Sequence, residues 1–208
     1  VGALRDCLAA IPHCSVSGVG ITVQRETFVL LDASFQPLRP AILWYDARGV
    51  PFLDRLSAEV DADSYHRRTG KQLDVTSAAV KLAWLQAHEP DVLARASHFA
   101  DVLGFLVQRF TGRFATADAG VDTTGFVDMQ RKDWTDSTLH RCGLCRDQLP
   151  ALLPSGTLAG RVSGGAAQAT GLPEGIPVVV SGGDGHCSAY AASLVVADSA
   201  SLSLGTSG

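Results

Sequence analysis

The segment Val-Val-Val-Ser-Gly-Gly-Asp-Gly, residues 178–185, holds the side chain best placed for chemistry. A fully apolar run is followed by two glycines and then by Asp184. In open α/β sheets, ligands gather beyond the carboxyl ends of strands, where glycine lets the backbone approach a substrate closely. A carboxylate at that point can accept the proton of a hydroxyl that attacks an electrophile. Aspartate also caps helices well, so these residues alone leave both roles open for Asp184.

A second polar group, Gln24, Arg25 and Glu26, separates two apolar runs that predict strands over residues 14–23 and 28–32. A tight turn between two strands favours Gly or Asn rather than two bulky opposite charges. The residues therefore form either a solvated hairpin tip or a polar pair held at the mouth of a sheet to grip a hydroxylated ligand.

A third candidate follows an expected strand at residues 40–45 and consists of Trp44, Asp46 and Arg48. The indole could cover one face of a bound sugar, while the two charged groups supply an acceptor and donors. An equally good interpretation places Trp44 in the core and leaves the charges as a surface ion pair, which contributes little. Lys71 and Lys81 could contact phosphate, although solvated helix faces fit them better.

The chain ends in Gly205, Thr206, Ser207 and Gly208 after an expected strand at residues 200–204. Successive backbone N–H groups in such a turn form a concavity for anions, and the two hydroxyls add donors. A plain hairpin turn is the alternative. Neither GxxxxGK[ST] nor GxGxxG occurs in the chain, so a nucleotide would bind without a P-loop or a Rossmann fingerprint.

The elements that must position these residues alternate between strands and long helices, which predicts an α/β fold. A buried strand at residues 178–181 precedes an Ala-rich helix that extends to about residue 196. A Pro- and Gly-rich connection spans residues 150–177. We expect further helices over residues 50–66, 75–88, 91–110 and 134–142.

Composition narrows the function classes. The 208 residues carry a net charge of −4, which gives no basic field for nucleic acid or anionic lipid. No apolar run approaches the roughly 20 residues of a membrane span. The five cysteines lack the spacing of a disulfide framework, which favours reduced thiols in the cytoplasm. Cys142 and Cys145 have the spacing of half a zinc site, but nothing completes it, so we expect no metal site.

Several segments together resemble one family, the FGGY carbohydrate kinases. The resemblance covers residues 20–27, similar to the substrate motif of glycerol kinases, and residues 41–48, similar to a W-x-D-x-R strand end. It continues through a D-x-L-x-x-x-L-T-G-like helix at residues 101–112, followed by Thr116 and Asp118. Residues 178–189 resemble the segment with the catalytic aspartate, and residues 203–208 resemble the second phosphate loop.

The resemblance implies an actin-like, ribonuclease-H-like ATPase fold in which two domains close around ATP. Residues 1–190 would form the substrate-binding first domain without its first phosphate hairpin, and residues 191–208 would begin the second domain. The chain starts at Val1 and stops inside a Gly-rich turn, so we expect a fragment of a longer protein that is inactive by itself.

Carried over residue by residue, the resemblance makes Asp184 the catalytic base and makes Arg25 and Glu26 the pair that holds substrate hydroxyls. It assigns Gln24, Trp44, Asp46 and Arg48 to the substrate site and Gly205, Thr206 and Ser207 to ATP phosphates. A guanidinium and a carboxylate together offer donors and acceptors suited to adjacent hydroxyls.

The implied activity is phosphorylation of a small sugar or polyol by ATP with Mg²⁺. A non-catalytic sugar-binding protein or sensor is the alternative. The pocket mixes glycerol-kinase features (Arg25 and Glu26) with xylulokinase features in residues 182–185, so the substrate stays open. A homo-oligomer also stays open.

Overall fold

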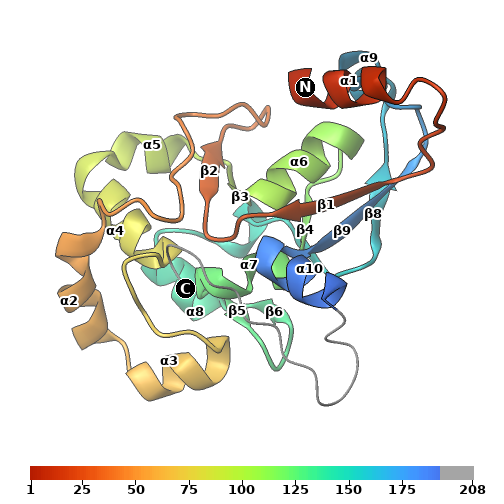
Figure 1. The fold of residues 1–208 in the computed structure, drawn as a ribbon. Coiled ribbons are helices and arrows are strands. Elements are labelled where there is room, and N and C mark those ends of the chain that lie inside the picture. The colour runs from red at the N-terminus through yellow and green to blue at the C-terminus, as the bar shows by residue number, and fades with distance from the viewer. Residues whose placement is uncertain (193–208) are drawn as a thin grey trace.

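The computed structural model of the chain describes residues 1–192 (Figure 1). The expected strand at residues 200–204 and the candidate phosphate-loop residues Gly205, Thr206 and Ser207 lie outside the described residues. Within residues 1–192, no helix is long and apolar enough to cross a membrane.

The described part alternates short strands with helices. The strands are β1 (Val19–Val23), β2 (Phe28–Leu31), β3 (His98–Asp101), β4 (Ala115–Ala117), β5 (Val127–Asp128), β6 (Asp133–Trp134), β7 (Ala151–Leu153), β8 (Leu158–Arg161) and β9 (Pro177–Gly183). The α-helices are α1 (Gly2–Ala10), α2 (Val50–Glu59), α3 (Ala62–Thr69), α4 (Ala78–His88), α5 (Pro90–Arg95), α6 (Val102–Thr111), α7 (Asp118–Val121), α8 (Asp136–Arg141), α9 (Gly164–Thr170) and α10 (Asp184–Ala191). Two 3₁₀ helices are η1 (Asp122–Thr124) and η2 (Arg146–Gln148).

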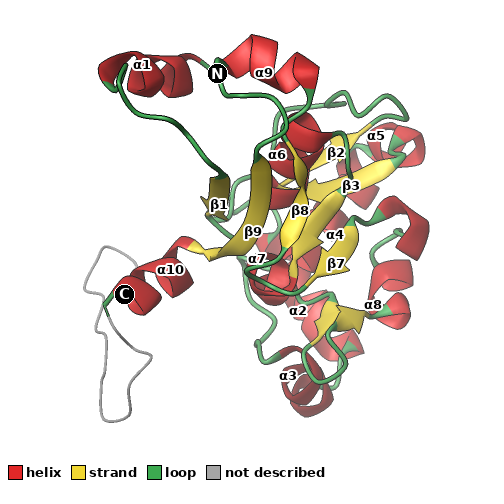
Figure 2. Ribbon diagram, turned by 90° about the vertical axis from the view of Figure 1, so that its right-hand side faces the viewer, coloured by secondary structure: helices red, strands yellow, loops and turns green. Residues whose placement is uncertain are grey.

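The sheet that carries the candidate site has the order β1-β9-β8. β1 is parallel to β9, with Val19 opposite Val178 and Ile21 opposite Val180, and β8 is antiparallel to β9. The β-branched residues of β1 and β9 favour this pleated, half-buried surface. Helix α6 packs on all three strands, and α10 continues from the carboxyl end of β9 (Figure 2).

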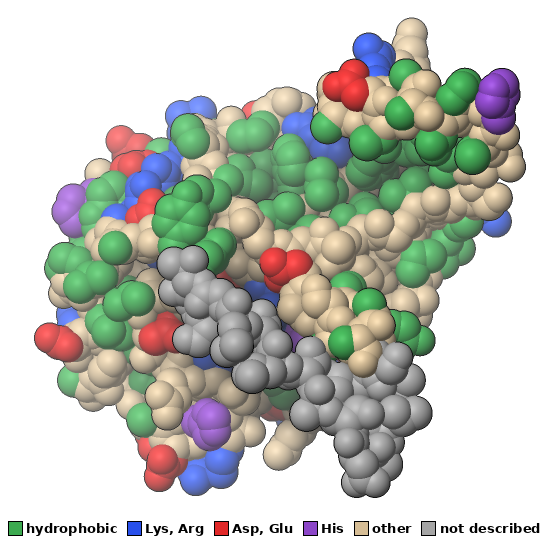
Figure 3. Space-filling view, in the orientation of Figure 1, with side chains coloured by type: hydrophobic (Ala, Val, Ile, Leu, Met, Phe, Trp, Pro, Cys, Tyr) green, Lys and Arg blue, Asp and Glu red, His purple; other side chains and the backbone are tan. Residues whose placement is uncertain are grey.

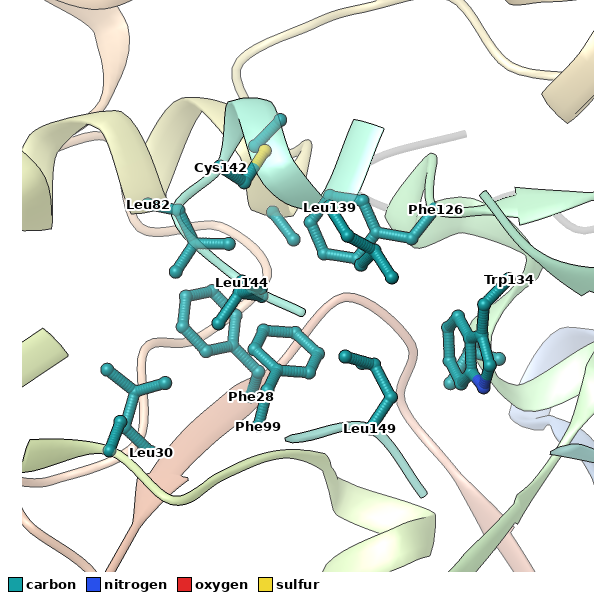
Figure 4. Packing of buried hydrophobic residues seen from close by; sticks show 14 of the residues in the cluster. Phe28, Leu30, Leu82, Phe99, Phe126, Trp134, Leu139, Cys142, Leu144 and Leu149 are labelled. Carbon is teal, nitrogen blue, oxygen red and sulfur yellow. The ribbon is translucent and has the colours of Figure 1, made fainter. Parts of the chain in front are cut away.

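Two large apolar clusters hold the chain together. One joins β2 and β3 to α4 and α8, and in it the rings of Phe28 and Phe99 stack with centroids 4.9 Å apart (Figure 4). The other joins β1, β9 and α6 and extends to α9, on which α1 packs. Hydrophobic side chains also cover the surface over α6, below α1 (Figure 3). The link that carries Gln24, Arg25 and Glu26 joins β1 of the second cluster to β2 of the first.

The link between β1 and β2 is not a hairpin, so the interpretation of Gln24, Arg25 and Glu26 as a solvated hairpin tip is wrong. β1 pairs with β9, whereas β2 pairs antiparallel with β3. The three polar residues therefore connect two different sheets. Glu26 takes a φ of +64°, a conformation that few non-glycine residues adopt.

Other elements also differ from the expectations. The helix expected over residues 91–110 is α5, then strand β3, then α6, because Asp101 ends the strand and caps a new helix. The helix expected over residues 50–66 breaks before Asp61, whose side chain caps α3. The strand expected at residues 40–45 is a single bridge at Ile42. The connection at residues 150–177 contains β7, β8 and α9.

Candidate functional site

A pocket of about 320 Å³ brings together residues that are far apart in the sequence. The link between β1 and β2, the turn after Ile42, helix η1 and the start of α10 each contribute to its wall. Its lining consists of Gln24, Arg25, Glu26, Trp44, Thr123 and Asp184. The acid after the two glycines therefore faces the same space as the charged pair near the N-terminus.

Asp184 is the first residue of α10, and it is exposed. Gly183 occupies the N-cap position, so the alternative in which Asp184 caps the helix is wrong. One carboxylate oxygen accepts the backbone N–H of Gly185 at 2.9 Å. Within residues 1–192 the other oxygen has no hydrogen-bond partner. This oxygen is available to a ligand in the pocket.

Arg25 crosses the end of β9 to reach a carboxylate on η1. Its Nη1 donates to Oδ2 of Asp122 at 2.9 Å and lies 3.4 Å from Nε2 of His186. A Cβ atom on Gly183 would lie 2.6 Å from both Cδ and Nε of Arg25. Gly183 is therefore the residue type that lets the arginine lie against the strand end.

Glu26 is buried and is held by Lys71, whose Nζ forms an ion pair and hydrogen bond with Oε1. The same ammonium donates to Oγ1 of Thr76 at 3.0 Å and lies 3.5 Å from Oδ2 of Asp74. Burial opposes ionisation of Asp74, but the hydrogen bond from Thr76 and the charge of Lys71 outweigh it and lower its pKa. A partly buried polar network of this kind is rigid when its groups are paired.

Lys81 is completely buried, so its assignment to a solvated helix face is wrong. Its Nζ donates to the backbone carbonyls of Trp44 and Thr76, both at 2.8 Å. Desolvation by burial lowers the pKa of Lys81 to about 8. The two lysines that could have contacted phosphate instead hold two lining residues of the pocket, Lys81 at Trp44 and Lys71 at Glu26.

Trp44 lines the pocket, but Asp46 and Arg48 do not. They pair with each other, with Nε and Nη2 of Arg48 each 2.8 Å from a carboxylate oxygen of Asp46. The hydrogen bond from Arg48 lowers the pKa of Asp46 despite partial burial. The guanidinium of Arg48 also lies 4.8 Å from the ring centroid of Trp84. This pair stabilises the turn that follows Trp44.

Sequence reasoning missed Asp122 and Thr123. Asp122 pairs with Arg25, and the Thr123 hydroxyl is buried without a hydrogen-bond partner in the described part of the chain. The local sequence of η1 carries no motif that marks a site. Only the tertiary approach of η1 to the link between β1 and β2 brings these residues to the pocket.

Metal-binding groups do not cluster in the described residues, where no three His, Cys, Asp or Glu side chains could share an ion. Burial raises the pKa of the Cys142 thiol to about 12. The Cys145 thiol donates to Oε1 of Gln148 at 3.4 Å, within the turn that starts η2. These two thiols thus have structural surroundings.

Comparison with known proteins decides the family. The FGGY family of carbohydrate kinases, N-terminal domain, matches residues 3–191. The chain belongs to the FGGY family of carbohydrate kinases. The FGGY kinases have the actin-like ATPase fold, and the α/β architecture described above agrees with it.

Among its FGGY relatives, the xylulose kinase of Escherichia coli (strain K12) is 37% identical over 193 residues, which are 93% of this chain and 39% of that protein. The solved xylulose kinase from Rhodospirillum rubrum aligns with a TM-score of 0.87 and 27% identity, covering 91% of this chain and 39% of that one. A gluconate kinase from Lactobacillus acidophilus has a TM-score of 0.82 at 18% identity, covering 89% of this chain and 37% of that one, and shows the fold alone. The chain thus spans about two fifths of the length of these relatives.

Proposed function

We propose that the protein containing this chain transfers a phosphoryl group from ATP to a hydroxyl of a small sugar or polyol. The observation that carries the proposal is the shared pocket, which Asp184 lines together with Arg25 and Glu26. A base beside groups that hold hydroxyls is the arrangement needed to activate one hydroxyl of a polyhydroxy compound. The family membership supports the same reaction class.

The proposed roles follow from the contacts. Arg25 keeps N–H groups beyond the one used by Asp122, and Glu26 keeps the oxygen that Lys71 does not hold, so the pair can bind adjacent hydroxyls. Gln24 adds an amide, and Trp44 offers an apolar face to the carbon skeleton. Asp184 would take the proton of the attacking hydroxyl on its free oxygen. Asp46 and Arg48 would act by fixing the turn that presents Trp44.

Bound ATP with Mg²⁺ would supply the phosphoryl group and offset its negative charge. Mg²⁺ is usually held by one or two carboxylates together with substrate phosphates and water. We assign phosphate contacts to Gly205, Thr206 and Ser207. We also propose that residues 1–190 form the substrate-binding domain and that residue 191 begins the ATP-binding domain.

For the substrate, we propose a ketose such as D-xylulose ahead of a glycerol-like polyol. The E. coli relative at 37% identity is named a xylulose kinase, and this is the support for the order. Free cysteines at all five positions support a cytoplasmic location as part of the same proposal. The relatives are named as kinases, and no observation favours a non-catalytic sugar-binding protein.

The test uses the full-length gene product with a panel of ketoses and polyols, and ADP release is measured. Asp184→Asn should lower kcat by about 10³-fold, within the range of general-base contributions, because the amide cannot accept the proton. Sugar affinity should change less than about threefold, because the isosteric amide keeps the hydrogen bond from Gly185. Asp54→Asn, an exposed position on α2, is the matched control. Near-normal turnover of Asp184→Asn would show that Asp184 is not the base, and absence of ADP release from the wild type with every compound would refute the proposed function.

A further inference from the structure

The fold does not fix the charge of the ligand. By their names, the solved structures that share it include a xylulose kinase, whose sugar is uncharged, and a gluconate kinase, whose substrate is an acid. The choice between an uncharged and an anionic compound must therefore come from side chains at the pocket and behind it.

The positive charge in the pocket already has a counter-ion. Arg25 is the cation of the lining, and its Nη1 lies 2.9 Å from Oδ2 of Asp122. Both side chains are mostly buried, at 27% and 18% exposure, so solvent screens the pair only partly. Asp122 is not part of the lining, and it neutralises the arginine from behind the wall. A carboxylate ligand would have to compete with Asp122 for this guanidinium.

The negative charge of Glu26 is compensated in the same way by a residue outside the lining. Lys71 holds Oε1 of Glu26, and the two side chains are 14% and 8% exposed. Lys71 is also absent from the lining. Because Arg25 and Glu26 each already have an ion-pair partner, the lining within residues 1–192 offers hydrogen-bond donors and acceptors but no unpaired cationic side chain. In the described residues, Asp184 is the charged lining residue that has no ion-pair partner.

We propose that Asp122 and Lys71 are specificity-determining residues that make the pocket select an uncharged polyhydroxy compound against the corresponding aldonate. This inference rests on the proposed function for the location of the sugar, but not on Asp184 being the base. An aldonate carboxylate would meet Asp184 with no unpaired cation nearby, whereas a hydroxyl can bind Arg25 and Glu26 without disturbing either pair. Thr123, with its buried unpaired hydroxyl, adds one more group that an alcohol can satisfy.

The two counter-ions have opposite signs, so their removal should shift selectivity in opposite directions. Asp122→Asn leaves the shape of the side chain and removes its charge, which frees Arg25 for a carboxylate. Lys71→Met removes the cation behind Glu26 and makes the pocket more negative. A role in packing alone would weaken uncharged and anionic compounds alike, and it would not give opposite shifts.

The experiment measures the dissociation constants of D-xylulose, xylitol and D-xylonate by calorimetry, with displacement titrations for the weak ligand. It uses the full-length gene product without nucleotide. The wild type should bind D-xylulose or xylitol at least about tenfold more tightly than D-xylonate. Asp122→Asn should reduce that ratio by about tenfold, equivalent to roughly 1.4 kcal/mol, and Lys71→Met should increase it. Lys71→Arg should restore the wild-type ratio, because it keeps the charge.

Asp133→Asn is the matched control, since it removes a carboxylate that pairs with Arg146 in an exposed position away from the pocket. Equal binding of D-xylonate and the uncharged compounds by the wild type would overturn the inference, as would absence of binding of both uncharged compounds. Unchanged ratios in folded Asp122→Asn and Lys71→Met proteins would also overturn it. Selective binding without ADP release would support the inference while refuting the proposed kinase activity.

Discussion

Two junctions between a strand and the following helix, β3 to α6 and β9 to α10, each carry an aspartate, and the two aspartates have opposite surroundings. At the end of β3, Asp101 is 3% exposed and occupies the N-cap position of α6. At the end of β9, Asp184 is exposed and stands one position later, inside the first turn of α10. The difference of one position follows from Gly183, which takes the N-cap itself.

The hydrogen bonds show what each carboxylate is free to do. Asp101 accepts the N–H groups of Leu103 and Gly104 at 3.1 and 3.2 Å and the hydroxyl of Thr116 at 2.9 Å. Asp184 accepts only the adjacent Gly185 N–H among the described residues. An acid that stabilises a helix uses both oxygens on its own protein, whereas an acid that is to react keeps one oxygen open to the pocket.

Removing the two carboxylates in turn should change the stability of the two helices by very different amounts. Asp101→Ala should lower the free energy of opening of α6 by about 4 kcal/mol, because it removes the cap and leaves a buried hydroxyl and buried N–H groups unpaired. Asp184→Ala should change the free energy of opening of α10 by less than about 0.5 kcal/mol, as surface substitutions usually do. Native-state hydrogen exchange of the α6 and α10 amides measures both effects.

Loss of activity should be large at Asp184 and small at Asp101, the reverse of the expected loss of stability. This reversal serves as the internal control. Asp184→Ala should abolish ADP release in a protein that remains folded, whereas Asp101→Asn, which keeps a capping oxygen, should retain most of it. If Asp184→Ala destabilised its helix as much as Asp101→Ala destabilises α6, the two junctions would be equivalent and the distinction drawn between them would be wrong.

The buried position of Asp101 should also make the stability of the folded chain depend on pH. Burial raises the pKa of Asp101 from its ordinary value near 3.8 to about 6, even though Thr116 and three backbone N–H groups favour the ionised form. Below pH 3.8 the group is protonated in both the folded and the unfolded chain. As the pH rises towards 6, the unfolded chain loses this proton first, so the contribution of Asp101 to stability falls by about 3 kcal/mol.

Urea unfolding of the wild type and of Asp101→Asn between pH 4 and pH 7 measures this contribution. The asparagine keeps the cap but does not titrate, so the free energy of unfolding of the wild type should decline relative to the variant up to about pH 6 and then run parallel to it. Parallel curves over the whole range would show that burial does not raise the pKa of Asp101.

The sequence predicted the fold class, strand β9 and the end of helix α6, but it did not predict how residues 91–110 divide into elements. Long apolar segments with β-branched residues predicted β9, and the Thr-Gly pair predicted the end of α6 at Gly112, which has a φ of +76°. The pattern failed over residues 91–110, because apolar residues at helical spacing also fit a helix, a buried strand and a second helix in succession. Periodicity does not distinguish these cases when each piece is short.

For the candidate site, too, some residues could be predicted from the sequence and others could not. The resemblance pointed to Asp184, Arg25 and Glu26, and the structure places all three on one pocket. It could not locate Asp122, the partial burial of Lys71 beside Glu26 or the complete burial of Lys81 at Trp44, since these depend on which segments approach one another in the folded chain. Charged residues are usually solvated, so a buried lysine is evident only once its surroundings are known.

The smallest expected effect is that of replacing Gly183, the residue that takes the N-cap position of α10 in place of Asp184. Gly183→Ala keeps an extended backbone conformation that alanine also adopts, with φ near −63°, so strain at the residue itself is not expected. Its Cβ, however, would lie 2.6 Å from Cδ and Nε of Arg25, and the arginine must move away from the pocket wall. Sugar affinity should therefore fall about tenfold, or roughly 1.4 kcal/mol, in a calorimetric titration.

Gly185→Ala is the control in the same segment for this last effect. Nothing lies within 4 Å of the position that its Cβ would take, and alanine favours the helix, so the sugar affinity of this variant should match that of the wild type. Equal sugar affinities of the Gly183→Ala and Gly185→Ala proteins would show that the position of Arg25 does not depend on Gly183.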